Sequence, residues 1–373
     1  MGNREVASGK REAGSGTRSA EHGTRNTEPA LRWPAEFEPQ SFVQLIFPHA
    51  HSDWLPYLDE ACETFAEIAR QIARFEPCLI VCDDIDRVAA YFDDLHNLFF
   101  TAYRTDDTWA RDCSGISVET PGGARIRDFT FTGWGGKFDA ALDNAMTVNI
   151  AGCYGAPVDT VSYVLEGGAV ESDGRGTVLT TEACLLNPNR NGATTRGAVE
   201  KVLRDTLGAQ RVLWLGSGYL AGDDTDSHID TLARFCDENT IAYVRCDDPE
   251  DEHFEALKKM EEDLRRFRTA GGDPYRFVAL PMTDPVFYED ERLPATYANF
   301  LILDGAVLVP VYGDRHDDEA LNIIRGLFPG REIVGVDCRV LIRQHGSLHC
   351  VTMQFPAAAG LRCASSVPAG SLS

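Results

Sequence analysis

The amino-acid sequence predicts an α/β fold in a single domain, for three reasons. Apolar stretches of strand length alternate along the chain with amphipathic stretches at helical spacing. No linker rich in Pro, Gly or Ser divides residues 29–360. The chain of 373 residues has a hydrophobic fraction of 43% and a charged fraction of 25%, so it can bury the core of a globular protein.

The first elements show both patterns. Residues 41–47 read as a strand, and residues 78–82 read as a buried strand. Between them, apolar side chains from Leu58 to Ile72 recur at spacings of three and four, which predicts one long amphipathic helix. Residues 87–95 are predicted to form a second helix. This order of strands and helices is typical of α/β proteins.

The same alternation continues to the end of the domain. Further strands are expected at residues 98–103, 125–131, 160–165, 177–180, 211–215, 241–245, 277–280, 299–303, 307–311 and 350–354. Further helices are expected at residues 195–206, 250–267 and 317–328.

Two segments flank the domain. Residues 1–28 are polar, rich in Gly, Ser and Arg, and without periodicity, which predicts disorder. They lack the apolar stretch of a secretory signal. Residues 361–373 form a short polar tail that we expect to be frayed. No run of about 18 apolar residues occurs, so we expect no membrane span.

The composition limits the classes of partner that the protein can bind and indicates its redox setting. The net charge of −23 disfavours nucleic acid and favours small cations, although a solvated acidic surface alone would explain it. The 11 cysteines include no CxxC pair, and several lie in apolar runs. We expect buried free thiols and a reduced, cytoplasmic setting. The sequence allows a homo-oligomer and does not specify one.

Residues 223–230 place four carboxylates around one imidazole. His228 and Asp230 stand two apart in what reads as an extended segment, so their side chains should share one face. Because unpaired buried carboxylates are unfavourable, these acids must be solvated, bind a metal or bind an organic cation. The spacing lacks the glycine and the distal Glu of an EF-hand loop. The roles of Asp223, Asp224 and Asp226 stay open.

Two further segments could bind a planar cation. Trp109 could stack on it while Asp112 accepts its N–H bonds, although a surface loop with a local ion pair has the same composition. Glu166 precedes two glycines at a predicted strand end. Glu166 could orient a catalytic imidazole, and the glycines suggest a close backbone approach, but an ordinary turn would look alike.

Cys350 follows a turn that contains Gly346. Such a turn could present the thiol at a cavity, although a cysteine in a strand-like run is more often a core residue. His349 is adjacent in sequence, but neighbouring side chains on a strand point to opposite faces. We therefore expect His228 to be the better partner of the thiol.

Over residues 31–356 the chain resembles the agmatine deiminase family, which includes the porphyromonad-type peptidylarginine deiminases. The resemblance rests on eight segments in the order of the family, namely residues 33–39, 47–49, 107–112, 165–168, 185–191, 222–230, 296–300 and 346–350. Single motifs of this kind are weak, whereas eight in order are specific.

The resemblance implies a five-bladed α/β propeller of pseudo-fivefold ββαβ repeats, with the active site on the axis. Seven residues match functional positions of the family, with Cys350 as the nucleophile, His228 as the general acid and base, Glu166 as its support, Asp112 and Asp230 as the guanidinium-binding pair, Trp109 in the channel and Asn299 in the site wall. Ser227 and the run before Cys350 depart from the family pattern, which bears on the substrate.

The implied reaction is hydrolytic deimination of a guanidino compound without a metal or cofactor. The first expectation is agmatine, converted to N-carbamoylputrescine and ammonia through a thiouronium on Cys350. Free or peptidyl arginine is the alternative, and Arg104 or Arg111 could then receive the substrate carboxylate or carbonyl. A non-catalytic protein that binds metal or polyamine through residues 223–230 is an alternative of another class.

Overall fold

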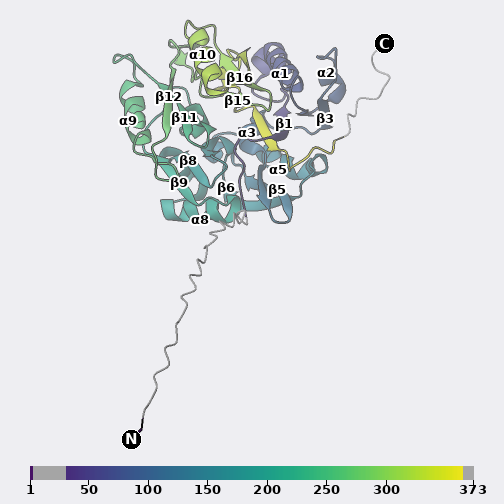
Figure 1. Ribbon diagram of the computed structural model, residues 1–373. Helices are drawn as coiled ribbons and strands as arrows, with labels where there is room; N and C mark the ends of the chain where they lie inside the picture. The colour runs from purple at the N-terminus through teal and green to yellow at the C-terminus, as the bar shows by residue number, and fades with distance from the viewer. Residues whose placement is uncertain (3–30, 364–373) are drawn as a thin grey trace.

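Five sheets with one strand pattern form most of the structure (Figure 1). In each, one strand pairs antiparallel with one neighbour and parallel with another, and a helical connection joins the parallel pair. The computed structural model describes residues 1–2 and 31–363, so most of the predicted disordered segment lies outside the described residues. The α/β prediction is confirmed.

Each sheet is a short run of strands that follow one another in space. The strands of the five sheets, in spatial order, are β18 (Thr352–Pro356), β1 (Gln40–Ile46), β2 (Cys78–Cys82) and β3 (Leu98–Ala102); β4 (Ile116–Thr120), β5 (Gly123–Thr130) and β6 (Val158–Val164); β7 (Val170–Ser172), β8 (Thr177–Thr181) and β9 (Arg211–Leu215); β10 (Ala233–Asp237), β11 (Thr240–Arg245) and β12 (Arg276–Pro281); and β15 (Leu301–Ile302), β16 (Ala306–Val311) and β17 (Glu332–Asp337). A small hairpin adds β13 (Phe287–Tyr288) and β14 (Glu291–Arg292).

Helices cover these sheets, and the larger ones lie at the periphery of the view in Figure 1. The α-helices are α1 (Leu58–Ala73), α2 (Ile85–Ala89), α3 (Ala110–Cys113), α4 (Gly133–Gly136), α5 (Ala141–Asn149), α6 (Glu182–Leu185), α7 (Pro188–Asn191), α8 (Arg196–Leu207), α9 (Phe254–Leu264) and α10 (Asp317–Leu327). Helix α1 buries one apolar face, including Phe65, Ile68 and Ile72, against the sheet that contains β2.

The two ends of the described domain meet in one sheet. Strand β18 pairs antiparallel with β1, with Val43 opposite Gln354. This pairing brings the turn before β18, which contains Cys350, close to other segments of the chain. Those segments are the ones that precede the first strands of the other four sheets. This closure places Cys350 beside residues far away in sequence.

Most of the predicted elements are present. The strands at residues 78–82 and 211–215 match β2 and β9, and the long helix predicted from Leu58 to Ile72 matches α1. The helix predicted at residues 87–95 is wrong in position. The side chain of Asp84 accepts a hydrogen bond from the backbone of Arg87, which starts α2 earlier, and α2 ends at Ala89.

Two local predictions near the motifs are wrong. His228 and Asp230 do not lie in an extended strand, because His228 caps a short 3₁₀ turn, η4 (Ile229–Thr231), and β10 begins only at Ala233. Cys350 does not lie in a strand either, since it belongs to the turn before β18. The strands β4, β7, β10 and β17 and the helix α5 were not predicted at all.

The cysteines follow the prediction with one exception. Nine are buried free thiols, including Cys184 and Cys350. Cys153 and Cys363, however, form a disulfide across 210 residues of sequence, so the free-thiol prediction is wrong for this pair. The bond attaches the start of the predicted tail to the 3₁₀ turn η2 (Ala151–Cys153). Within residues 31–363 no helix is long and apolar enough to cross a membrane.

Candidate active site

The predicted site residues lie just before the first strands, in spatial order, of the five sheets. Asp112 precedes β4, Glu166 precedes β7, and the pair of His228 and Asp230 precedes β10. Asn299 precedes β15, and Cys350 precedes β18. Contacts join α3 to η3 (Gly167–Ala169) and to β18, and η3 to η4, and Asn299 is hydrogen-bonded to the turn before β18, so these five segments converge on one place.

Asp112 is buried and held by two donors. Its Oδ1 accepts a hydrogen bond from the backbone N–H of Gly168 at 2.9 Å, and its Oδ2 accepts one from Nε1 of Trp134 at 2.9 Å. Oδ1 also lies 3.6 Å from Nδ1 of His228. Burial raises the pKa of Asp112, and the negative charges of Asp230 and Glu166 add to the effect against the opposing charge of His228.

The site leaves no room for a side chain at Gly168. A methyl group on it would lie 2.6 Å from Nδ1 of His228, 2.9 Å from Oδ1 of Asp112 and 3.2 Å from Oδ2 of Asp230. No side chain other than hydrogen fits such distances. The close approach predicted for the two glycines after Glu166 is therefore confirmed: Gly168 approaches the predicted catalytic residues, and Gly167 approaches the backbone oxygen of Arg111.

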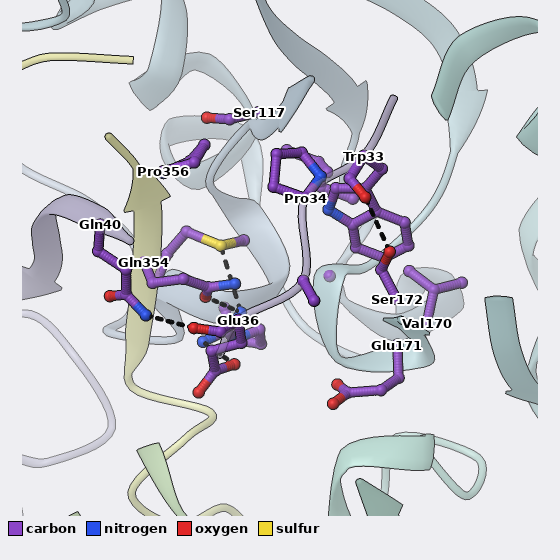
Figure 2. Close-up of a pocket in the computed structure, with 15 residues that line it drawn as sticks. Trp33, Pro34, Glu36, Gln40, Ser117, Val170, Glu171, Ser172, Gln354 and Pro356 are labelled. Atoms are coloured by element: carbon purple, nitrogen blue, oxygen red, sulfur yellow. Dashed lines mark hydrogen bonds and ion pairs between the residues drawn. The ribbon is translucent and has the colours of Figure 1, made fainter. Parts of the chain in front are cut away.

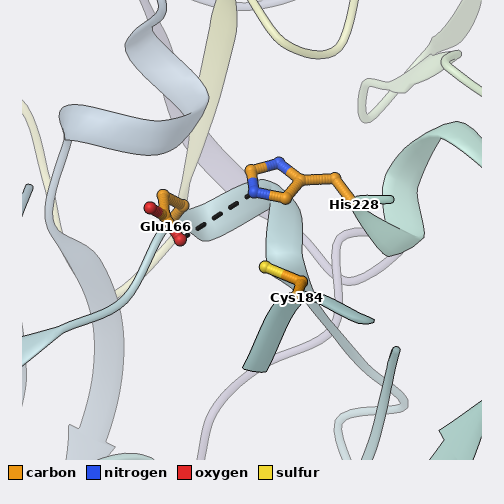
Figure 3. A group of neighbouring side chains, drawn as sticks. All are labelled: Glu166, Cys184 and His228. Atoms are coloured by element: carbon orange, nitrogen blue, oxygen red, sulfur yellow. Dashed lines mark ion pairs between the residues drawn. The ribbon is translucent and has the colours of Figure 1, made fainter. Parts of the chain in front are cut away.

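His228 lies close to the carboxylate of Glu166 and the thiol of Cys184 (Figure 3). Its Nε2 has no hydrogen-bond partner among the described residues and lies 3.9 Å from Oε2 of Glu166, with the thiol of Cys184 nearby. Burial alone would lower the pKa of His228, but Asp112, Cys184 and Glu166 raise it well above its ordinary value. This shift favours the protonated imidazole, which can act as an acid.

Glu166 is tied to the acidic loop through Arg190, which sequence reasoning missed. Nε of Arg190 donates to Oε1 of Glu166 at 3.1 Å, and its Nη2 donates to the backbone oxygen of Thr225 at 2.8 Å. Nη1 of Arg190 also pairs with Asp226. Burial would raise the pKa of Glu166, but the nearby positive charges of His228 and Arg190 and the hydrogen bond from Arg190 lower it. Asp226 thus fixes the loop through Arg190.

Asp230 has one occupied and one free oxygen. Its Oδ2 lies 2.7 Å from Nδ1 of His349 and 3.8 Å from Sγ of Cys350. Its Oδ1 is buried without a hydrogen-bond partner in the described residues. Burial would raise the pKa of Asp230, but the hydrogen bond and charge of His349 lower it below the ordinary range. A buried, ionised and unpartnered oxygen is suited to a cationic N–H donor.

The side chain of Asn299 fixes the turn that carries the thiol. Its Oδ1 accepts from the backbone N–H of His349 at 2.8 Å and of Cys350 at 3.3 Å, and lies 3.4 Å from Sγ of Cys350. Burial raises the pKa of Cys350 well above its ordinary value, and the charges of Asp230 and Asp112 raise it further. The free protein therefore carries a neutral thiol.

A cavity of about 110 Å³ leads to this thiol. Its residues are Asp53, Asp107, Trp109, Asp112, Trp134, Phe138, Asp224, Thr225, Gln344, His345, Gly346 and Cys350. The lining is acidic and aromatic, and none of these described residues is Arg or Lys. Arg104 is exposed outside the cavity, and Arg111 points elsewhere, toward Gln354.

The acidic loop does not assemble into a metal site within residues 31–363. Asp223 accepts hydrogen bonds from its own loop, at the backbone N–H groups of Thr225 and Ser227, and Asp226 pairs with Arg190. The one described group of three close metal-ligating side chains is different and consists of Glu166, Cys184 and His228. In this group Glu166 is already paired with the guanidinium of Arg190.

Sequence reasoning missed Trp134 and Cys184 and underrated His349. The sequence signal for Trp134 was its place among three glycines, in Gly133-Trp134-Gly135-Gly136. In the structure all four of these residues have positive φ. His349 was set aside because strand alternation was applied to a turn. Cys184 gave no signal beyond that of a core cysteine, which it also resembles by its complete burial.

The chain is similar to proteins of known family over almost all of the described domain. The sequence pattern of the Porphyromonas-type peptidyl-arginine deiminase family matches residues 32–356. The agmatine deiminase of Stutzerimonas stutzeri is 33% identical over 352 residues, which are 87% of this chain and 95% of that protein.

Two solved structures extend the similarity to the fold. A proposed arginine deiminase of Porphyromonas gingivalis is 49% identical with a TM-score of 0.85, covering 89% of this chain and 100% of that one. An agmatine deiminase of C. jejuni with substrate bound is 37% identical with a TM-score of 0.83, covering 89% and 97%. The chain therefore belongs to the Porphyromonas-type peptidyl-arginine deiminase family, together with the agmatine deiminases.

Proposed function

We propose that this hydrolase deiminates agmatine to N-carbamoylputrescine and ammonia through a covalent intermediate on Cys350. The observation that carries the proposal is the cavity in front of Cys350, whose walls are carboxylates and aromatic rings. Agmatine carries a guanidinium at one end and a primary ammonium at the other, so it is a cation at both ends of such a cavity. The agmatine deiminases among the relatives support the same substrate.

The acidic lining of the cavity in front of Cys350 favours agmatine over free arginine. Asp53, Asp107 and Asp224 line this cavity, and a carboxylate suits the ammonium of agmatine but repels the carboxylate of free arginine. Free arginine would need a cationic partner, and neither Arg104 nor Arg111 is among the lining residues. The 49% identical relative proposed to be an arginine deiminase keeps arginine as the second candidate.

The guanidinium binds between two carboxylates. Asp112, already fixed by Trp134 and Gly168, faces one side, and the unpartnered Oδ1 of Asp230 accepts an N–H from the other. Their bonds hold the planar cation with the face of its carbon open to Sγ of Cys350. The cation also neutralises the excess negative charge that raises the pKa values of Asp112 and Cys350.

The first half-reaction releases ammonia. The thiol of Cys350 loses its proton to solvent as the cation binds, and the thiolate adds to the guanidinium carbon to give a neutral tetrahedral adduct. His228, whose protonated form is favoured, transfers its proton to one amino group, and the C–N bond breaks. Ammonia leaves, and a positively charged thiouronium remains on sulfur.

The second half-reaction is hydrolysis. The now neutral His228 takes a proton from water, and the resulting hydroxide adds to the thiouronium carbon. The C–S bond breaks and the hydroxyl proton transfers to the departing sulfur, so that a neutral ureido product forms and the neutral thiol of Cys350 is restored. Glu166, 3.9 Å from Nε2, favours the protonated imidazole in both steps. Every step uses side chains of this chain.

The remaining sequence expectations stay proposals alongside this function. Five sheets of the same strand order support a five-bladed propeller with the five site segments around its axis. The nine buried free thiols support a reduced, cytoplasmic setting, against which the Cys153–Cys363 disulfide argues. Residues 29–360 are proposed as the catalytic domain.

The test is ammonia release from agmatine, free arginine and an arginyl peptide in parallel, with wild type and Cys350→Ala. We expect turnover of agmatine by wild type and a complete loss in Cys350→Ala without a change in the thermal unfolding midpoint. A chelator should change nothing. Turnover of arginine but not agmatine would refute the substrate, and normal turnover by Cys350→Ala would refute the covalent step. Chelator-sensitive binding without turnover would favour the metal- or polyamine-binding alternative.

A further inference from the structure

We propose that Glu36 and His349 are positioning residues, in which an imidazolium at His349, held from behind by Glu36, fixes the carboxylate of Asp230 toward the substrate. The inference rests on the proposed function only for what Asp230 binds. It accounts for the segment of residues 33–37, which belongs to the family resemblance but contributes no residue to the cavity in front of Cys350.

The evidence begins with the two ring nitrogens of His349. Nδ1 lies 2.7 Å from Oδ2 of Asp230, and Nε2 lies 2.7 Å from Oε2 of Glu36. An ionised carboxylate only accepts hydrogen bonds, so each nitrogen facing one must carry a proton. A histidine with both nitrogens donating is an imidazolium. All three side chains are at least nine-tenths buried, which keeps this pairing away from solvent.

The contacts of Glu36 favour its ionised form. Its Oε1 accepts from the backbone N–H of Ile302 at 2.8 Å, and its Oε2 accepts from Nη2 of Arg234 at 2.8 Å. Nη2 of Arg111 lies 3.7 Å away. Burial would raise the pKa of Glu36, but the charges of Arg234, His349 and Arg111 lower it strongly. A permanently charged Glu36 is the group that can hold an imidazolium at His349.

Residues 33–37 pack behind His349, and Glu36 is the residue of this segment that contacts it. Glu36 lines a second cavity, on the other side of His349 from Asp230, together with Trp33 and Glu171 (Figure 2). The backbone oxygen of Trp33 accepts a hydrogen bond from Ser172, which attaches the segment to β7. The segment thereby carries a carboxylate to the back of the site.

The consequence for the reaction is electrostatic and geometric. His349 occupies Oδ2 of Asp230, which turns the unpartnered Oδ1 into the acceptor left for substrate. The same Oδ2 is 3.8 Å from Sγ of Cys350, where an unscreened charge would repel the thiolate. An imidazolium at His349 lessens this repulsion while keeping Asp230 ionised.

Glu171 offers a matched control. Like Glu36 it is a buried glutamate paired with Arg234, whose Nε lies 3.1 Å from Oε2 of Glu171. Its other oxygen accepts from the backbone N–H of Phe235 at 3.1 Å, and no hydrogen bond joins it to His349 among the described residues. If Glu36 acted only by balancing Arg234, Glu171→Gln and Glu36→Gln would have equal effects.

The kinetic experiment compares Glu36→Gln, His349→Gln and Glu171→Gln with agmatine. We expect the KM of Glu36→Gln and of His349→Gln to rise about 10- to 100-fold with a smaller change in kcat, since a charge-assisted interaction that supports binding is lost. Glu171→Gln should change KM by less than about threefold. Equal effects at Glu36 and Glu171, with unfolding midpoints unchanged, would overturn the proposal.

A measurement on the wild type keeps the proposal independent of turnover and of variant folding. In protein labelled with ¹⁵N-histidine, both ring nitrogens of His349, assigned by loss of the signal in His349→Gln, should have the chemical shifts of an imidazolium at neutral pH. In Glu36→Gln one nitrogen should shift to the neutral form. A neutral His349 in the wild type refutes the inference. An imidazolium there, without ammonia release from any guanidino compound, refutes the proposed function alone.

Discussion

The indole of Trp134 donates a hydrogen bond through Nε1 to Oδ2 of Asp112 across 2.9 Å. Trp134 has a positive φ of 53°, unusual for a bulky residue, and glycines with positive φ flank it on both sides. The chain accepts this conformation where the indole reaches Asp112 and lines the substrate cavity. The carboxylate is therefore oriented before a substrate arrives.

Trp134→Phe should keep the aromatic wall and lose the hydrogen bond. We expect kcat/KM for agmatine to fall about 10- to 100-fold, because hydrogen bonds to charged groups contribute about 1.5–3 kcal/mol. Steady-state kinetics measure this. Trp214→Phe is the control, since Nε1 of Trp214 donates to Oε1 of Glu200 at 2.9 Å and neither residue lines the cavity in front of Cys350. If both variants lost activity equally, the bond to Asp112 would not be the cause.

Gly168→Ala should abolish activity through geometry alone. A methyl group there would lie 2.6 Å from Nδ1 of His228, so the imidazole or the backbone must move, and displacements near 1 Å can reduce rates about 100-fold. We expect a loss of kcat/KM of at least that size, measured by ammonia release. Gly197→Ala on α8, where nothing lies within 4 Å of the added carbon, should leave activity unchanged. An active Gly168→Ala variant would mean that the site is wider in solution.

The thiol of Cys350 should react slowly with alkylating agents in the free protein. Burial and the charges of Asp230 and Asp112 raise its pKa well above the usual 9.0, and only the thiolate reacts. The alkylation rate with iodoacetamide, followed at the Cys350 peptide by mass spectrometry, should therefore keep rising beyond about pH 9 without a plateau. The same peptide in denaturant should level off near the ordinary thiol pKa. A plateau below neutral pH in the native protein would instead indicate a resident thiolate.

The sequence allowed much of this site to be predicted because its chemistry is local to motifs. Residues such as Asp112, Glu166 and Cys350 end up together because each precedes the first strand of its sheet, although β4 and β7 themselves were not predicted and only the motifs marked these positions. Backbone detail was less predictable. Strand periodicity was extended through His228 and Cys350, where the structure has turns, and this error led to the dismissal of His349.

Long-range partners could not be predicted, since no local pattern encodes them. Glu36 meets His349 only because β18 returns to pair with β1. Arg190 meets Glu166 only because α7 lies beside β6. Short strands such as β7 were missed because three residues carry too little periodicity to be distinguished from a loop.

Glu76 provides a prediction about stability rather than catalysis. Its Oε2 accepts from the backbone N–H of Asp304 at 3.0 Å, while its buried Oε1 has no hydrogen-bond partner in the described residues. Burial raises the pKa of Glu76 from 4.5 to about 7, and the charges of Asp304 and Glu36 add to this. Because the folded pKa exceeds the unfolded one, folding stability falls as the pH rises from about 4.5 to 7.

Glu76→Gln should therefore stabilise the protein, but only where the native carboxyl is ionised. Above pH 7 the gain should approach about 1–3 kcal/mol, at roughly 1.4 kcal/mol per pKa unit, and it should vanish below about pH 4.5, where the carboxyl is protonated in both states. Urea midpoints at pH 8 and pH 4 measure the difference. Glu255→Gln, on the exposed face of α9, should shift neither midpoint by a comparable amount. A lower midpoint for Glu76→Gln at pH 8 would mean that the ionised carboxylate stabilises its surroundings, contrary to the sign derived from its burial.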